Sequence, residues 1–266
     1  MGGSKAVEGL CQALLNKGDS ALFRHEVAYV LGQMRDSEAC AVLEGVLADT
    51  ADDSMVRHEA AEALGAIGSK ASVEALQQFL SDPAPEVSQT CELALGLIHW
   101  RGQQDEDELD HNPYLSVDPS PSASKLISTA ELQEQLLDES LPLFERYRAM
   151  FSLRNRGSED DVLALGRALR ECQGALLKHE VAYVLGQVQH VASVPALAES
   201  LQDEGEHHMV RHEAAEALGA IGGALAEELL KTHQQDSEAV VKESCVVALD
   251  TMDYWSQASF NEDRVH

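Results

Sequence analysis

The sequence predicts an all-α protein, a helical-repeat solenoid made of two duplicated halves. Two strings occur twice without a change: HEVAYVLGQ begins at residues 25 and 179, and MVRHEAAEALGAIG begins at residues 55 and 209. The second copy of each string begins 154 positions after the first, and the two strings keep this offset without an insertion or deletion between them. The halves are therefore copies of one unit that itself contains several repeats.

Each half also has an inner period. His25 and His58 are 33 residues apart, and so are His179 and His212. Within each period, two segments rich in Ala and Leu have helical spacing, and short turns such as Gly65–Ser69 separate them. A period near 33 with two helices per repeat is typical of an α-solenoid, in which each repeat buries its apolar face against its neighbours. No segment alternates apolar and polar residues as a strand does.

The helical spacing places the second helix of each repeat in turn along the chain. These helices are expected at 20–34, 54–67, 85–99, 142–156, 174–188, 209–221 and 238–252.

Four segments are expected: an N-terminal half over 1–100, an acidic and proline-rich linker over 101–130, a C-terminal half over 131–254 and a tail over 255–266. The linker contains the acid cluster Asp105–Glu108 and prolines that no helix runs through. Residues 146–157 align with 57–68 and form the first repeat of the second half, but they have almost no counterpart 154 positions earlier. The N-terminal half is therefore expected to lack its first repeat.

The chain is strongly acidic: 19 Lys and Arg residues face 46 Asp and Glu residues, a formal net charge of −27. Such a surface repels phosphate backbones, which argues against nucleic acid as a partner. It attracts a basic protein or a cationic small molecule, although acidity also serves solubility alone.

The sequence also bounds the compartment. No apolar stretch has the length of a membrane helix, the N-terminus lacks the apolar region of a signal peptide, and Ala6 stands where myristoylation requires Ser or Thr. The five cysteines include no C-x-x-C pair, which favours free thiols in a reducing compartment. We therefore expect a cytoplasmic protein without a membrane partner.

The dipeptide His-Glu occurs four times, at one equivalent place near the start of a second helix. The four pairs are His25-Glu26, His58-Glu59, His179-Glu180 and His212-Glu213. Neighbouring repeats have other residues there: Gln89-Thr90, Glu243-Ser244 and Tyr147-Arg148. The solenoid therefore folds without His-Glu, and two consecutive repeats in each half carry it for another reason.

Adjacent residues of a helix point about 100° apart, so we expect a metal ion to be held between the helices of successive repeats. Two histidines and a carboxylate are the ligand set of non-haem iron, whereas structural zinc sites favour Cys and His. The alternative is that the histidines are half-buried helix-start residues, with a glutamate that suits the positive end of the helix dipole.

With the four His-Glu pairs in tandem repeats and the linker Pro113-Tyr114-Leu115-Ser116-Val117-Asp118-Pro119, the sequence resembles deoxyhypusine hydroxylase. The segment Leu143–Phe151 is similar to that family as well. The resemblance implies a HEAT-like fold and a di-iron monooxygenase, with Fe²⁺ in the active form and O₂ as co-substrate. Its substrate would be the deoxyhypusine form of eukaryotic translation initiation factor five-A, which is hydroxylated to hypusine.

The resemblance also implies the roles of the site residues. His25, His58 and Glu59 would form one iron ligand set, and His179, His212 and Glu213 the other. Glu26 and Glu180 are either further ligands or catalytic, substrate-binding carboxylates that anchor the ammonium groups of the substrate. The identical neighbours of the pairs, Gly32, Gly186, Met55 and Met209, are candidates for the lining of the substrate-binding pocket.

A different class of function is a binding scaffold, because helical-repeat proteins often present a concave surface to protein partners. A scaffold predicts a colourless protein without stoichiometric metal. The enzyme predicts about two irons per chain.

Overall fold

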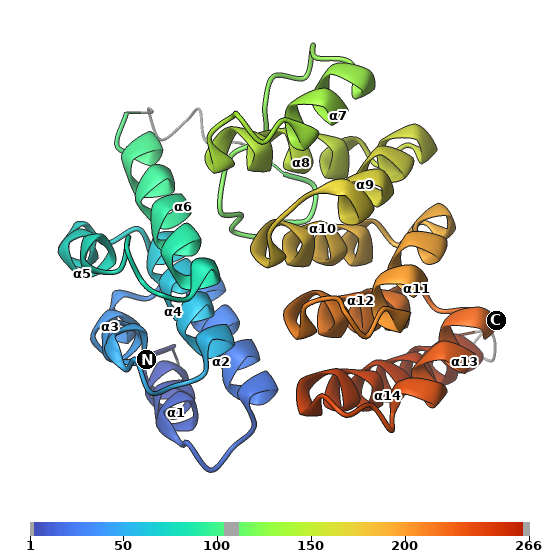
Figure 1. Ribbon diagram of the computed structural model, residues 1–266. Coiled ribbons are helices and arrows are strands. Elements are labelled where there is room, and N and C mark those ends of the chain that lie inside the picture. Colours follow the sequence, from blue (N-terminus) through green and yellow to red (C-terminus); the bar gives the residue numbers. More distant parts are fainter. Residues whose placement is uncertain (1–2, 104–111, 263–266) are drawn as a thin grey trace. The chain divides into compact units, whose positions relative to one another are not determined.

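The computed structural model describes residues 3–103 and 112–262, and within these ranges it contains helices and no strands (Figure 1). Contacts divide the chain into two units. Unit 1 consists of Met1–Ala123 and Leu141–Arg148, and unit 2 of Ser124–Ser140 and Ala149–His266. The all-α, duplicated helical-repeat architecture expected from the sequence is confirmed.

Unit 1 is a stack of antiparallel helix pairs. Its helices are α1 (Gly3–Leu15), α2 (Ala21–Met34), α3 (Cys40–Ala48), α4 (Ser54–Ile67), α5 (Val73–Gln78) and α6 (Pro85–Arg101). The second helices α2, α4 and α6 pack directly on one another, and apolar residues between the two layers form a continuous core. Each repeat therefore buries its apolar face against its neighbours.

Unit 2 repeats this arrangement. Its helices are α7 (Thr129–Leu137), most of α8 (Leu143–Arg156), α9 (Glu159–Glu171), α10 (Ala175–Val188), α11 (Val194–Gln202), α12 (His208–Ile221), α13 (Ala224–His233) and α14 (Ala239–Glu262). Here α10, α12 and α14 form the stack of second helices.

All seven expected second helices are confirmed, and each begins within one residue of its expected start. Polar caps set several of these starts: the Ser20 side chain accepts a hydrogen bond from the Phe23 N–H, and that of Asp53 accepts one from the Met55 N–H. Helix α14 differs, since it continues to Glu262 rather than ending near 252. No Gly or Pro interrupts residues 253–262, so nothing in the local sequence ends the helix earlier.

The segment expected to be a single linker, 101–130, is divided between structured elements. Helix α6 includes Arg101, residues 112–123 belong to unit 1, and α7 begins at Thr129 in unit 2. The Gln33 side chain anchors the loop, because its Oε1 accepts from the Val117 N–H at 2.8 Å and its Nε2 donates to the Val117 carbonyl at 3.2 Å. The acid cluster Asp105–Glu108 lies outside the described residues.

The structure also bears on the cysteines and on membrane-spanning segments. All five cysteines are free thiols, and only Cys40 is not fully buried. Over the residues that the structure describes, no helix combines the length and the apolar character needed to cross a bilayer.

The spacing between stacked second helices depends on a repeated glycine–alanine contact. A Cβ atom added to Gly32 would lie 2.8 Å from the Ala63 Cα on the next helix, and one added to Gly65 would lie 2.7 Å from the Ala94 Cβ. Unit 2 repeats both contacts, with Gly186 against Ala217 and Gly219 against Ala248. Each glycine lies seven residues after the histidine of a His-Glu pair. The two helices therefore approach closely just beyond the pairs that they carry.

We expect Gly32→Ala to lower the free energy of unfolding by about 1–3 kcal/mol, because the new methyl group meets the backbone of α4 and forces the helices apart. Gly45→Ala is the matched control, since Gly45 is exposed in α3 and an added Cβ meets nothing within 4 Å. This control should stabilise the protein by about 0.5–1 kcal/mol. Urea unfolding of both variants measures the difference, and equal stabilities would contradict the close approach.

Candidate functional site

The four His-Glu pairs lie in the second turn of α2, α4, α10 and α12, at the same position in each helix. All four histidines are buried: His25 is 4% exposed, His58 0%, His179 5% and His212 0%. Because the close helix crossing lies just beyond them, successive pairs face each other across the interface between two second helices.

In unit 1 the two pairs form one compact polar cluster. The His25 Nε2 lies 3.2 Å from Glu59 Oε2, and the His25 Nδ1 lies 2.9 Å from Glu26 Oε1. The His25 and His58 rings have centroids 5.4 Å apart. A ring nitrogen of His25, a ring nitrogen of His58 and a carboxylate oxygen of Glu59 lie within 4.8 Å of one another. This is a buried set of two imidazoles and one carboxylate.

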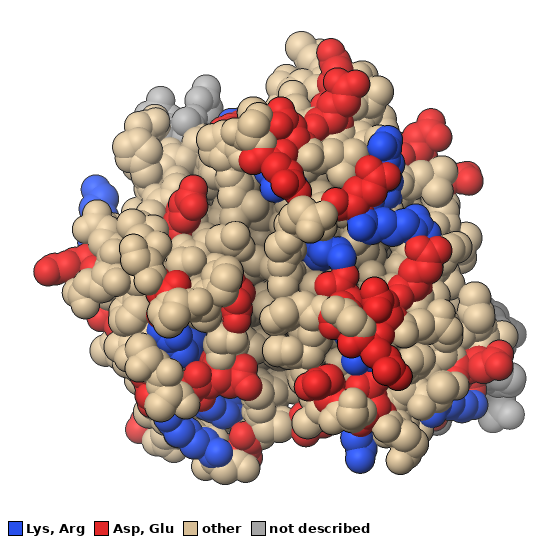
Figure 2. All heavy atoms as spheres, viewed as in Figure 1, with Lys and Arg blue, Asp and Glu red and all other residues tan. Residues whose placement is uncertain are grey.

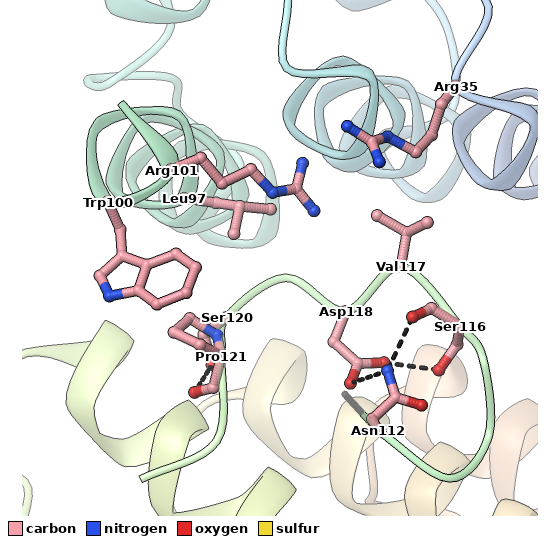
Figure 3. Close-up of a pocket in the computed structure, with 10 residues that line it drawn as sticks. All are labelled: Arg35, Leu97, Trp100, Arg101, Asn112, Ser116, Val117, Asp118, Ser120 and Pro121. Atoms are coloured by element: carbon pink, nitrogen blue, oxygen red, sulfur yellow. Dashed lines mark hydrogen bonds between the residues drawn. The ribbon is translucent and has the colours of Figure 1, made fainter. Parts of the chain in front are cut away.

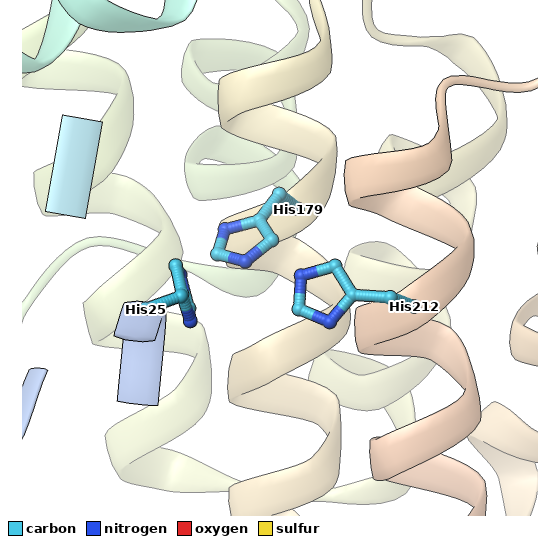
Figure 4. A group of neighbouring side chains, drawn as sticks. All are labelled: His25, His179 and His212. Carbon is cyan, nitrogen blue, oxygen red and sulfur yellow. The ribbon is translucent and has the colours of Figure 1, made fainter. Parts of the chain in front are cut away.

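Unit 2 repeats two of these contacts, the histidine–glutamate contact between successive pairs and the close approach of the two rings. The His179 Nε2 lies 3.3 Å from Glu213 Oε2, and the His179 and His212 ring centroids are 5.3 Å apart. Figure 4 shows these two rings projecting from the adjacent helices α10 and α12. The duplication has therefore preserved the contact geometry as well as the sequence.

The charges of the unit 1 cluster suit a bound cation. The Glu59 side chain is only 4% exposed, and within the described ranges it forms no ion pair with Lys or Arg. Burial lowers the pKa of His25, but the Glu59 and Glu26 carboxylates outweigh burial and raise this pKa well above 6.5. A buried carboxylate needs a positive partner, which is a proton on His25 or a metal ion bound in its place.

Comparison with known proteins agrees with this geometry. A model of HEAT repeats matches residues 7–96 and 162–250. Curated relatives named deoxyhypusine hydroxylase are 51% identical in Danio rerio and 52% in Homo sapiens, and these matches cover 98% of this chain and 85% and 84% of the relatives. The chain belongs to the deoxyhypusine hydroxylase family.

A solved structure supports the assignment. The structure of human deoxyhypusine hydroxylase in complex with glycerol matches with a TM-score of 0.88 and 51% identity, and the match covers 94% of this chain and 85% of that one. The family resemblance proposed from the His-Glu pairs and the linker is therefore confirmed.

The two halves of this deoxyhypusine hydroxylase family member differ around the shared histidines. Glu180 is buried, whereas Glu26 is half-buried. The His212 Nδ1 lies 3.4 Å from Ser244 Oγ, which donates a hydrogen bond to Glu216. Ser244 occupies the place of the glutamate in a repeat without a His-Glu pair, and reasoning from the sequence did not assign it to the site.

The remaining predicted site residues have distinct surroundings. Gly186 lines a cavity of about 300 Å³ in unit 2, together with Tyr183, Glu213 and apolar residues of α12 and α14. Gly32 lies against Ala63 at the α2–α4 crossing. Met55 and Met209 are buried in the turn that precedes a histidine of each unit.

A set of ion pairs that the sequence patterns did not predict fixes the residues before the histidines. Arg24, Arg57 and Arg211 each precede a histidine and pair with Asp52, Asp82 and Asp236, respectively. Lys178 precedes the fourth histidine and pairs with Glu206. The signal in the sequence is a basic residue before each His-Glu pair and an acidic residue 25 or 28 positions later.

The Arg57 pair shows how such a clamp works. The Arg57 Nη1 and Nη2 donate to the two carboxylate oxygens of Asp82 at 3.2 and 2.5 Å, while Nε donates to the Leu47 carbonyl at 3.0 Å. Both side chains are at most 3% exposed. The guanidinium thus links the end of α3, the start of α4 and the turn before α6, which fixes the backbone that carries His58.

We expect Asp82→Asn to lower the free energy of unfolding at neutral pH by about 3–5 kcal/mol, because it leaves the Arg57 charge buried without its partner. The side-chain hydrogen bond from Arg57 lowers the pKa of Asp82 below its ordinary value of 3.8. Its contribution to stability is therefore complete above that value and is lost as the pH falls through the lowered pKa.

Unfolding measured at several pH values should show a smaller acid-induced loss in Asp82→Asn than in the wild type. Asp250→Asn is the control, since Asp250 is exposed in α14 and forms no ion pair with another residue that the structure describes. An unchanged acid dependence in Asp82→Asn would show that the clamp does not stabilise the fold.

Proposed function

We propose that this protein is an iron-dependent monooxygenase that hydroxylates the deoxyhypusine residue of eukaryotic translation initiation factor five-A to hypusine. The observation that carries the proposal is the buried set of two histidines and a glutamate, present once in each unit of a chain whose relatives are named deoxyhypusine hydroxylase. Sister repeats with the same fold lack this set, so folding alone gives no reason for it.

His25, His58 and Glu59 would hold one iron ion, and His179, His212 and Glu213 the other. The donor chemistry suits Fe²⁺, because imidazole and carboxylate ligands bind it while leaving coordination positions open. A pair of such ions, when bound, would supply the activation of O₂ that hydroxylation of an unactivated C–H bond requires. The five free cysteines suit a reducing compartment, so we place the protein in the cytoplasm.

Glu26 and Glu180 are proposed to bind the cationic substrate rather than to act mainly as iron ligands. The aminobutyl arm of deoxyhypusine carries ammonium groups, which need carboxylate partners when water is excluded. Glu180 is the stronger candidate, because its carboxylate is buried. The cavity beside Glu213 has apolar walls at Ala217 and Val247, which suit an aliphatic chain with charged ends.

Surface charge supports a basic protein as the partner. On the face shown in Figure 2, acidic side chains form patches that basic side chains only partly interrupt. With a net charge of −27, this surface would speed the encounter with a lysine-bearing loop of the substrate protein.

The proposed metal ligands can be tested by substitution. His58→Ala and His212→Ala should each lose much of the iron, from about two ions per chain in the wild type, while the helix content stays nearly unchanged. Gln89→Ala is the matched control, because Gln89 occupies the histidine position of a repeat without the pair. Iron analysis of protein purified without chelators, together with circular dichroism, measures both. Full iron content in either histidine variant would show that the substituted residue is not a ligand, and a wild type without stoichiometric iron would favour the scaffold.

Substitution of Glu26 and Glu180 separates substrate binding from metal binding. Glu180→Gln and Glu26→Gln should weaken binding of the deoxyhypusine form of the substrate factor by about 1.5–3 kcal/mol, because each removes a charge-assisted hydrogen bond. Their iron content should stay near that of the wild type, and the exposed Glu204→Gln should change neither property. Iron loss as large as in His58→Ala would make both residues ordinary ligands.

A further inference from the structure

A second polar cavity lies in unit 1, outside the His-Glu cluster. It has a volume of about 150 Å³, and its walls come from the end of α2, the end of α6 and the loop that follows the acid cluster. Arg35, Trp100 and Arg101 line it together with loop residues such as Val117 and Pro121. Figure 3 shows the two guanidinium groups directed into the same space.

Two like charges thus face one cavity in a strongly acidic chain. Within residues 3–103 and 112–262, neither arginine forms an ion pair with a carboxylate, and the Arg35 side chain makes no hydrogen bond. Arg101 uses Nη1 to donate to the carbonyls of Gly65 and Ala66 at 3.3 and 2.9 Å. Burial and the charge of Arg35 lower the pKa of Arg101 to about 10, against a smaller opposite effect of Asp118.

Asp118 also lines the cavity, and its carboxylate is already engaged by its own loop. Asp118 accepts hydrogen bonds from the Ser116 hydroxyl at 2.6 Å and from the Asn112 amide at 3.1 Å. Gln33 holds the same loop through two hydrogen bonds to Val117. The wall that faces the two arginines is therefore preorganised, which reduces the entropy that a ligand would lose on binding.

The duplicated half shows that the fold does not require these arginines. The positions that correspond to Arg35 and Arg101 are Gln189 and Trp255. Arg35 and Gln189 end their helices with the same left-handed backbone, each with a φ of 54°. Arg101 binds carbonyls at the end of α4, whereas Trp255 takes its place in the sequence of the second copy, where α12 corresponds to α4. The repeat therefore folds without this pair of arginines, although Arg101 also binds these carbonyls in unit 1.

We propose that the cavity between Arg35 and Arg101 binds a small dianion of the phosphate class. With Asp118 counted, the charged residues that line the cavity carry one net positive charge, which favours an anion. A phosphoryl dianion has enough oxygen atoms to accept hydrogen bonds from both guanidinium groups at once, and the planar donor fork of arginine matches these oxygens. The small volume limits the group to a free phosphate or to a single phosphoryl group at the end of a side chain.

Tryptophan fluorescence provides a direct test, because the chain has only two tryptophans and Trp100 lines the cavity. Trp255→Phe leaves Trp100 as the only tryptophan reporter. In this background, titration with inorganic phosphate at constant ionic strength should give a saturable change in emission. Acetate, which carries one charge, should bind at least about tenfold more weakly.

Arg35→Gln should weaken phosphate binding by about tenfold or more. Its melting temperature without phosphate should match that of the parent, since the Arg35 side chain makes no hydrogen bond in the described part of the chain. Arg167→Gln removes an exposed arginine paired with Glu171 in α9 and should bind phosphate as the parent does.

The same titration with O-phosphoserine distinguishes the two sources of the dianion. Tighter binding of O-phosphoserine assigns the site to a phosphorylated side chain, and tighter binding of inorganic phosphate assigns it to the free ion; both outcomes support the proposal. Three outcomes would overturn it: no saturable signal, undiminished binding by Arg35→Gln, or acetate binding as tight as that of phosphate.

Discussion

The close approach of a glycine on one second helix to an alanine on the next is the constraint on which the rest of this structure depends. It recurs at four interfaces, and at each of them an added methyl group would meet an atom within 3.0 Å. Packing this tight tolerates little change in volume. It also brings the histidine rings of successive repeats to 5.4 Å in unit 1 and 5.3 Å in unit 2, so the repeat packing builds the candidate metal site.

A second interaction acts on the residue before each histidine. A solenoid with a net charge of −27 nevertheless buries three Arg–Asp pairs, each hydrogen-bonded across repeats. These pairs hold the helix starts, while the histidines one residue later point elsewhere because adjacent helical residues are about 100° apart. Each repeat with a His-Glu pair thus places two kinds of residue side by side: a cation of an ion pair that orders the backbone, and a buried histidine of the candidate metal site.

The duplication is an internal control for both proposals. Four repeats carry His-Glu and others fold with Gln89, Glu243 or Tyr147 at the same place, so the pairs are not needed for folding. The copies have also diverged: Glu26 is half-exposed where Glu180 is buried, and Arg35 in one copy is Gln189 in the other. The conserved geometry supports shared metal ligation, and the differences support separate tasks for the two units in binding other ligands.

The sequence by itself determined the helices, the duplication and the four His-Glu pairs, because helical periodicity, caps and exact repeats are local signals. Only the tertiary structure decided which groups meet. The Arg57–Asp82 clamp, the Gly32–Ala63 contact and the Gln33–Val117 anchor join residues 25, 31 and 84 positions apart. It also decided that residues 112–123 belong to unit 1, whereas the prolines predicted a linker between the halves over 101–130. Spacing along the chain specifies how each helix begins and which face it buries, whereas the partner of a side chain depends on how the helices stack, which only packing in three dimensions determines.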